Sequence, residues 1–162
     1  MPNQELTFGE EEFIVSKTDL NGKITYGNSL FIQMSGYSEL ELIDHPHNIL
    51  RHEDMPAVVF KLLWSRIKAG KEIFAYVKNK TKDGDYYWVF AHVTPSFDTN
   101  RAISNYHSVR RKPTEKALNV IRPFYATLLQ KERQGGVSAS EAALNQLLQD
   151  KGMSYDEFIL SL

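Results

Sequence analysis

Along the first two thirds of the chain, segments in which hydrophobic and polar residues alternate are separated by segments whose apolar residues recur at helical spacing. The last third of the chain has the helical pattern throughout. Five runs have the alternation and the β-branched or aromatic content of strands: residues 13–16, 23–27, 72–81, 85–95 and 101–110. Asn21-Gly22 and Lys82-Asp83-Gly84 separate successive runs and are typical turn sequences. The pattern therefore predicts two antiparallel hairpins and a further strand.

Between the two hairpins, residues that cap helices precede short apolar stripes. Asn28 and Ser38 each stand before such a stripe, and Ser38 has Glu41 at the spacing of a capping box. Asp54 and Pro56 predict the start of a longer helix, with Asp54 as its N-cap. One face of that helix is apolar: Val59, Phe60, Leu63, Trp64 and Ile67.

Both ends of the chain lie outside the strand pattern. Residues 1–12 are polar and acidic and predict a flexible or helical arm, whereas residues 113–134 predict an amphipathic signalling helix with a kink at Pro123. A glycine pair follows as a hinge, and residues 137–162 predict two short helices. Their apolar stripes are too short to be stable alone. We expect this accessory extension to pack on itself, on the preceding helix or on a partner, and its removal to leave cofactor binding intact.

The central strands are apolar on both faces, which an antiparallel sheet usually is not. One face carries Phe74, Tyr76, Trp88 and Phe90. Left bare, it would form an apolar patch that is large for a monomer. We therefore expect it to be covered by the N-terminal arm, by the helix after the sheet or by a second subunit.

Composition excludes several classes of function. The 162 residues are 42% hydrophobic and 24% charged, with a net charge of −1, which disfavours binding to nucleic acid or to an anionic membrane. The absence of cysteine excludes disulfides, thiolate metal sites and cysteinyl photochemistry. No apolar run reaches the roughly 18 residues of a spanning helix, and the acidic N-terminal region is unlike a signal peptide. We expect a soluble, cytoplasmic protein without direct membrane insertion.

The predicted order of elements, β-β-α-α-α-α-β-β-β, is the layout of an α+β PAS domain. Specific residues strengthen this likeness: Ser35-Gly36-Tyr37-Ser38, Pro46-His47-Asn48, Arg51-His52, Asp54-Met55-Pro56, Trp64, Val77-Lys78-Asn79, Lys82-Asp83-Gly84-Asp85 and Tyr87-Trp88-Val89. With them, residues 12–130 resemble the sensory PAS domain of the bacterial aerotaxis and energy-taxis receptors. The resemblance implies a PAS fold over residues 13–112, with a five-stranded antiparallel sheet, short helices on one face and C-terminal helices after it.

In that family the domain binds FAD noncovalently, and the redox state of the flavin reports electron-transport status. The chain resembles the stand-alone PAS half of a bipartite energy-taxis system, since it shows neither a membrane anchor nor a long signalling coil. The resemblance thus implies a redox sensor that signals by conformational change to a separate transmembrane chemotaxis receptor of the methyl-accepting type, with a homodimer compatible. No arrangement of catalytic residues stands out, so no enzymatic activity is expected.

Several residues are candidates for contacts with the flavin ring. Trp64 and Phe60, one turn apart, would offer an aromatic face, although two core aromatics would have the same spacing. Asn79 lies on the inward face of its strand, where its amide would pair with ring carbonyls and N–H groups; the alternative is an asparagine near a turn. Tyr87 shares that face and would border the ring.

Other candidates belong to the phosphates or match family positions. Arg51 and His52 would bind a diphosphate near a helix N-terminus, although Arg51 could equally form a surface ion pair with a neighbouring carboxylate. Asp54 is first an N-cap and second a ligand contact. Asn28 and His47 match positions that the family uses around its ligand, and each is also a plausible cap.

Two alternatives remain open from the sequence. Histidines at positions 45, 47 and 52 raise the possibility of haem, but their spacing matches no compact metal motif. A ligand-free PAS domain that only dimerises or docks a receptor is the other alternative. The colour of the purified protein separates these hypotheses, and without the resemblance FAD and FMN are not distinguished.

Overall fold

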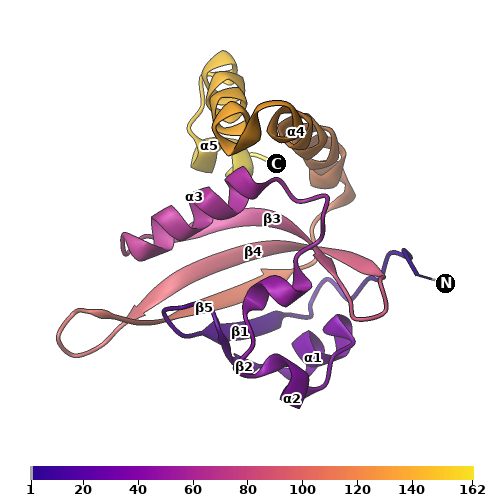
Figure 1. Cartoon of the computed structure of the whole chain (residues 1–162), viewed down its shortest axis with the longest axis vertical. Helices are drawn as coiled ribbons and strands as arrows, with labels where there is room; N and C mark the ends of the chain where they lie inside the picture. The colour runs from indigo at the N-terminus through magenta and orange to yellow at the C-terminus, as the bar shows by residue number, and fades with distance from the viewer. Residues whose placement is uncertain (1) are drawn as a thin grey trace.

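A five-stranded antiparallel sheet forms the centre of the computed structural model, which describes residues 2–162 (Figure 1). The strands are β1 (Ile14–Thr18), β2 (Ile24–Gly27), β3 (Ile73–Lys80), β4 (Tyr86–Phe97) and β5 (Ile103–Arg111). Their order across the sheet is β2-β1-β5-β4-β3, so the first hairpin pairs with β5, the strand that follows the second hairpin. The predicted α+β architecture is confirmed.

The helices fall into two groups. Those between β2 and β3 are α1 (Ser29–Ser35), α2 (Glu39–Leu42), the 3-10 helix η1 (His47–Leu50) and α3 (Ala57–Lys68); those after the sheet are α4 (Glu115–Lys151) and α5 (Tyr155–Leu160). Two of the three predicted caps are present: Asn28 Oδ1 accepts a hydrogen bond from the Phe31 amide at 3.0 Å, and Ser38 Oγ accepts one from the Glu41 amide at 3.2 Å. Within residues 2–162, no helix is both long and apolar enough to cross a membrane.

The prediction that Asp54 caps α3 is wrong. Pro56 occupies the N-cap position in an extended conformation, and no side chain from this segment caps the helix. The amide of Ala57 instead donates to Glu132 Oε2 of α4 at 3.0 Å, while Asp54 accepts from Lys78 Nζ at 2.9 Å. The helix begins beyond the reach of Asp54, and a carboxylate distant in sequence takes its place.

The C-terminal helices cover the second apolar face of the sheet, as one of the predicted arrangements required. Tyr76 and Trp88 are buried, and Phe74 and Phe90 are half-buried. The ring of Tyr125 in α4 lies 6.1 Å from that of Trp88. The cover of Tyr76 and Trp88 comes from the chain itself, while Phe74 and Phe90 keep part of their surface exposed.

Side chains from other elements also close the free edge of β3. The Tyr125 hydroxyl donates a hydrogen bond to the Tyr76 carbonyl at 2.6 Å, and the Tyr155 hydroxyl of α5 donates one to the Phe74 carbonyl at 2.8 Å. These carbonyls lie on the outer edge of β3, the last strand in the order, where unsatisfied groups invite pairing with another chain. The extension after residue 137 therefore packs on the sheet edge as well as on the first half of α4.

The shape of α4 is set by glycine rather than proline. Its backbone stays helical through Pro123, where a kink was predicted, and the only non-helical angles in α4 belong to Gly135 and Gly136. Gly136 has φ 79°, a conformation that favours glycine. The predicted hinge thus turns the chain back on itself, and Ser140 Oγ joins the two halves by donating to the Leu128 carbonyl at 2.9 Å.

The N-terminal arm, predicted to be flexible or helical, forms no helix over residues 2–12. It runs extended beside the start of β4, where the Tyr86 amide donates to the Gln4 carbonyl and the Leu6 amide donates to the Tyr86 carbonyl. Phe8 of the arm is buried. The arm is therefore an added edge segment of the sheet; Met1 lies outside the described residues.

Candidate ligand cavity

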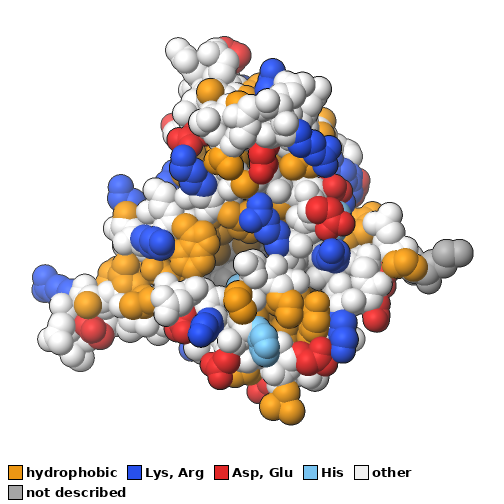
Figure 2. Space-filling view, in the orientation of Figure 1, with side chains coloured by type: hydrophobic (Ala, Val, Ile, Leu, Met, Phe, Trp, Pro, Cys, Tyr) orange, Lys and Arg blue, Asp and Glu red, His pale blue; other side chains and the backbone are white. Residues whose placement is uncertain are grey.

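A cavity of about 600 Å³ lies between α3, η1, the β1–β2 turn and the inward face of the sheet. Figure 2 shows this face of the molecule hollowed below α3, with hydrophobic and basic side chains around the opening. Its size and mixed lining are those of sites for small molecules and cofactors. The lining includes Ser16, Asn21, Gly22, His47, Asn48, Arg51, Phe60, Leu63, Trp64, Ile67, Val77, Asn79, Ala91, Val93, Tyr106, Ser108 and Arg110.

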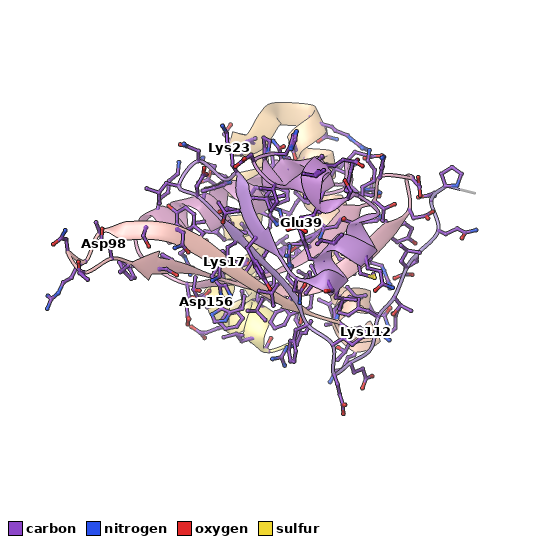
Figure 3. The ribbon with its side chains drawn as sticks, turned by 90° about the horizontal axis from the view of Figure 1, so that it is seen from below. Lys17, Lys23, Glu39, Asp98, Lys112 and Asp156 are labelled. Atoms are coloured by element: carbon purple, nitrogen blue, oxygen red, sulfur yellow. The ribbon has the colours of Figure 1, made fainter. Side chains whose placement is uncertain are left out.

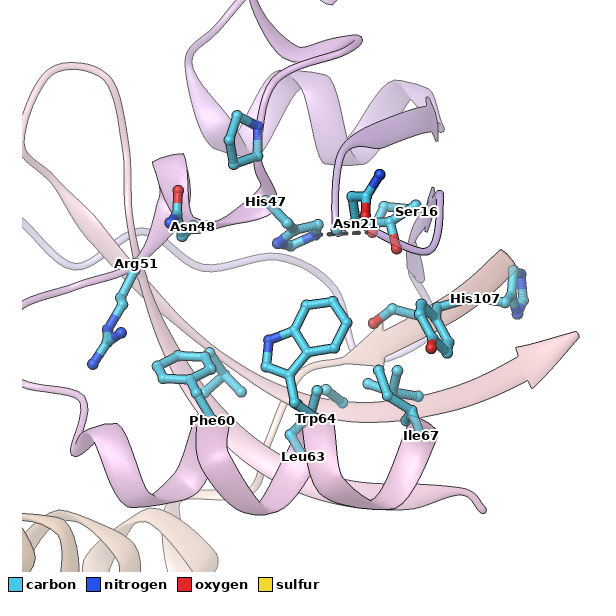
Figure 4. A pocket seen from close by; sticks show the side chains of 18 of the residues that line it. Ser16, Asn21, His47, Asn48, Arg51, Phe60, Leu63, Trp64, Ile67 and His107 are labelled. Atoms are coloured by element: carbon cyan, nitrogen blue, oxygen red, sulfur yellow. Dashed lines mark hydrogen bonds between the residues drawn. The ribbon is translucent and has the colours of Figure 1, made fainter. Parts of the chain in front are cut away.

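Two aromatic side chains of α3 form one wall (Figure 4). Phe60 and Trp64 are one turn apart, both half-buried, and both line the cavity. The Trp64 ring stands perpendicular to that of Tyr106, with centroids 5.7 Å apart. Its edge packs against Gly22, where a Cβ would lie only 3.0 Å from Trp64 Cζ2. Glycine at this turn therefore lets the indole lie at the cavity surface.

Arg110 of β5 is the principal cation inside the cavity, and sequence reasoning missed it. It is only 3% exposed, donates to Ser16 Oγ at 2.6 Å, and has its Nη1 3.2 Å from His47 Nε2. Among residues 2–162, Arg110 forms no salt bridge, and its Nε has no hydrogen-bond partner. Burial lowers its pKa to about 10, so it stays charged at neutral pH. A buried cation without an anion is costly, which favours a ligand with electron-rich atoms.

The charge of Arg110 fixes the state of His47. Burial first, and then Arg110, lower the pKa of His47 to about 3, so the imidazole is neutral near pH 7. An arginine can only donate, hence the network assigns the lone pair to Nε2 and the proton to Nδ1. The hydroxyl of Ser16, which accepts from Arg110, lies 3.1 Å from the same Nε2. The three side chains form one connected polar floor.

Asn79 and Tyr87 lie opposite each other in the β3–β4 register. Asn79 is 4% exposed and lines the cavity, whereas Tyr87 is fully buried and lies outside the lining. Within the described chain, the Tyr87 hydroxyl has no hydrogen-bond partner. Burial raises the pKa of Tyr87, and the neighbouring Arg110 and Asn79 partly offset this, so the hydroxyl is neutral.

Arg51 lies at one end of the cavity, and His52 next to it in sequence lies outside the cavity lining. The Arg51 guanidinium lies 4.6 Å from the Phe60 ring centroid and lines the opening. His52 is buried but does not line this cavity, and its Nδ1 accepts a hydrogen bond from the Asp54 amide at 3.0 Å. Burial is the main cause of its lowered pKa. His52 lines a second cavity of about 430 Å³, together with Asn48, Arg51, Glu53, Met55, Leu129 and Glu132.

The remaining two candidates line neither cavity. Asn28 has a structural role, since its Oδ1 also accepts from the Val15 amide at 3.1 Å and its Nδ2 donates to the Phe13 carbonyl at 2.9 Å. Asp54 is about half exposed and pairs with Lys78. The structure thus brings together Trp64, Phe60, Asn79, His47 and Arg51 in the first cavity and leaves Asn28, His52, Asp54 and Tyr87 outside its lining.

Charged side chains are distributed around the whole molecule rather than gathered on one side, as Figure 3 shows for residues such as Lys17, Glu39, Asp98 and Asp156. The part of the chain from Pro2 onward contains no cluster of three or more histidine, aspartate or glutamate side chains suited to a metal ion. The cavity is therefore the feature with the most evident capacity for a ligand.

Comparison with known proteins agrees with this geometry. A family model described as PAS fold matches residues 24–110. The Aerotaxis receptor of Escherichia coli (strain K12) is 38% identical over 125 residues, which cover 77% of this chain and 24% of that protein. The Nitrogen fixation regulatory protein of Klebsiella pneumoniae is 25% identical, over 60% of this chain and 20% of that one. The chain thus spans about a quarter or less of these relatives.

Solved structures with the same fold include the light state of the blue-light photoreceptor Aureochrome1 LOV. It is 25% identical with a TM-score of 0.56, and the match covers 77% of this chain and 92% of that one. An RNA-binding Light-Oxygen-Voltage receptor, 19% identical over 75% of this chain and 35% of that one, has a TM-score of 0.60 and shows the fold alone.

Proposed function

The chain belongs to the PAS family, and from that premise we propose that it is a sensory domain of taxis signalling that binds FAD noncovalently. The flavin ring would lie in the cavity below α3. The observation that carries the proposal is the combination of an aromatic wall with a buried, partly unpartnered polar floor. The likeness to the Aerotaxis receptor supports the taxis role. We propose that the domain acts as a sensor without enzymatic activity.

The residues present fit a flavin. An isoalloxazine is flat, largely apolar and rich in acceptor atoms along one edge, so it needs a stacking face and placed donors. Trp64 and Phe60 offer the face, while the Arg110 guanidinium offers positive charge and the Asn79 amide offers donors from the floor. A domain with no ligand would leave the Arg110 charge buried without compensation, which argues against a purely structural adaptor.

FAD, when bound, would supply reversible electron-transfer chemistry, and the chain's own residues would respond to its charge. Arg110 remains cationic beside the ring position and favours added negative charge there. His47 is neutral and carries its proton on Nδ1, so it can donate without adding charge. These groups give the two redox states different contacts, which any signal requires.

The output would leave through the helices after the sheet. α3 carries the aromatic wall of the cavity, and its first amide is bound by Glu132 of α4. A shift of α3 therefore acts directly on α4. We propose a separate transmembrane chemotaxis receptor as the recipient of this signal, a cytoplasmic location for this domain, and a homodimer as a compatible assembly.

The visible spectrum of the purified protein tests the proposal. We expect a yellow protein with flavin absorption bands, and release of FAD on denaturation. A Soret band would replace the flavin proposal with haem, and a colourless protein that takes up no added flavin would favour the ligand-free adaptor.

A further inference from the structure

The two cavities adjoin each other. Asn48 and Arg51 line both, so the Arg51 side chain stands where one cavity meets the other. Figure 4 places Arg51 at the end of the first cavity, away from His107. A ligand longer than a flavin ring could therefore continue past Arg51 without crossing the protein core.

The second cavity differs in chemistry from the first. Met55 and the half-buried Leu129 of α4 give it apolar walls, and His52 and Asn48 add polar groups. Glu132 contributes a carboxylate that binds the Ala57 amide through one oxygen only. An ionised carboxylate can only accept hydrogen bonds, so its remaining capacity suits hydroxyl or amine donors on a ligand.

These features match the parts of an adenosine diphosphate group. A purine offers two flat apolar faces. In dinucleotide sites, carboxylates accept hydrogen bonds from the ribose hydroxyls, and the diphosphate is bound by a cation. Met55 and Leu129 could contact the purine, Glu132 could accept from the ribose, and Arg51 lies between them and the first cavity. The order along the two cavities is that of the groups along FAD.

We propose that the second cavity binds the adenosine half of the dinucleotide, with Leu129 and Glu132 of α4 as one of its walls. This inference rests on the proposed flavin function and extends it, since it makes a helix outside the PAS core part of the binding site. FMN would leave the second cavity without a ligand. The occupant of the cavity would thus determine both the choice of FAD over FMN and the contacts of α4.

Titration of the flavin-free protein with riboflavin, FMN and FAD tests the inference. We expect the wild-type protein to bind FAD roughly tenfold or more tightly than FMN, about the effect of one charge-assisted hydrogen bond. Glu132→Gln keeps an acceptor for the Ala57 amide but turns its NH2 toward the ribose donors. It should lower FAD affinity about tenfold and leave FMN affinity within about twofold.

Two further variants make the result decisive. Leu129→Ala should also lower the ratio of FAD to FMN affinity, and because the ratio is measured within one variant, a general loss of stability cancels. Glu141→Gln is the matched control, since Glu141 also joins α4 to α3 through Lys61 but lines neither cavity. Equal FAD and FMN affinities in the wild type, or an unchanged ratio in both variants, would overturn the inference. Failure of all three flavins to bind would instead refute the proposed function.

Discussion

Glu132 of α4 accepts a hydrogen bond from the backbone amide of Ala57, the first residue of α3, across 75 positions of sequence. The first amides of a helix have no partner within the helix and usually depend on a nearby side chain. Here the partner belongs to the helix that follows the sheet. The helix that walls the cavity and the helix expected to carry the signal are therefore joined by a direct bond.

Glu132→Ala should lower the free energy of unfolding by about 1 kcal/mol, the usual effect of losing an N-cap. Glu132→Gln should retain most of this stability, because its amide oxygen can still accept. Urea unfolding of both variants measures the difference. Glu141→Ala, which removes an exposed ion pair, should cost less than about 1 kcal/mol; equal losses at the two positions would contradict a capping role.

Tyr125→Phe should destabilise the protein by about 1–3 kcal/mol, because it leaves the buried Tyr76 carbonyl without its donor. Tyr155→Phe removes the neighbouring bond to Phe74 and should act in the same direction. Amide hydrogen exchange of α4 and α5 in each variant is the measurement. Unchanged exchange in both would show that these hydroxyls do not hold the helices on the sheet edge.

Trp64→Ala should lose most of the flavin on purification while far-UV circular dichroism stays that of a folded protein. The change removes an aromatic contact of about 0.5–1.5 kcal/mol and opens a void beside the ligand. Trp64→Phe should retain part of the flavin, with brighter emission because indole quenching is lost. Full flavin retention with unchanged emission, accompanied by lowered stability, would show that Trp64 is only a core residue.

Arg110→Met should separate stability from ligand binding. The free energy of unfolding of the flavin-free protein should stay the same or rise, since a buried cation without an anion is replaced by an apolar side chain. Flavin affinity should fall. Urea unfolding and flavin titration on the same sample give both values, and a variant that is less stable yet binds flavin normally would refute the assigned role.

His47 should make stability depend on pH between its ordinary pKa of 6.5 and its lowered value of about 3. In that window the unfolded chain binds a proton that the folded chain does not, so stability falls as the pH falls, by up to about 1.4 kcal/mol per unit. Arg110, Ser16 and Phe31 are its neighbours. His47→Asn should reduce the slope of unfolding free energy between pH 6 and 4, and an unchanged slope would place the dependence elsewhere.

Local signals in the sequence predicted the local structure well. The Asn21-Gly22 turn, the caps at Asn28 and Ser38 and the glycine hinge before residue 137 depend on contacts within a few residues, and all are present. The cap of α3 could not be predicted in this way, because Glu132 reaches it only through the tertiary packing of α4.

The same limit explains the missed cation of the site. Arg110 precedes a second arginine near the end of a strand, and such a pair is typical of a solvent-exposed strand end. Only the register, with Arg110 opposite Ile14 on β1 and Ala91 on β4, places it on the inward face. The sequence did carry one indication: Arg110 is two and four residues from Ser108 and Tyr106, so all three share one face of the strand. Asn79 and Trp64 were accessible to sequence reasoning because their own strand and helix patterns already point inward.

The hydrogen bonds that Tyr125 of α4 and Tyr155 of α5 donate to carbonyls of β3 affect recognition by other proteins. A partner that adds a strand to this edge must compete with Tyr125 and Tyr155 for the same carbonyls. Its apparent dissociation constant is therefore its intrinsic value divided by the fraction of molecules in which the edge is open. The C-terminal helices thus act as an intramolecular competitor, and any change that loosens them raises the affinity of such a partner without altering the surface it binds.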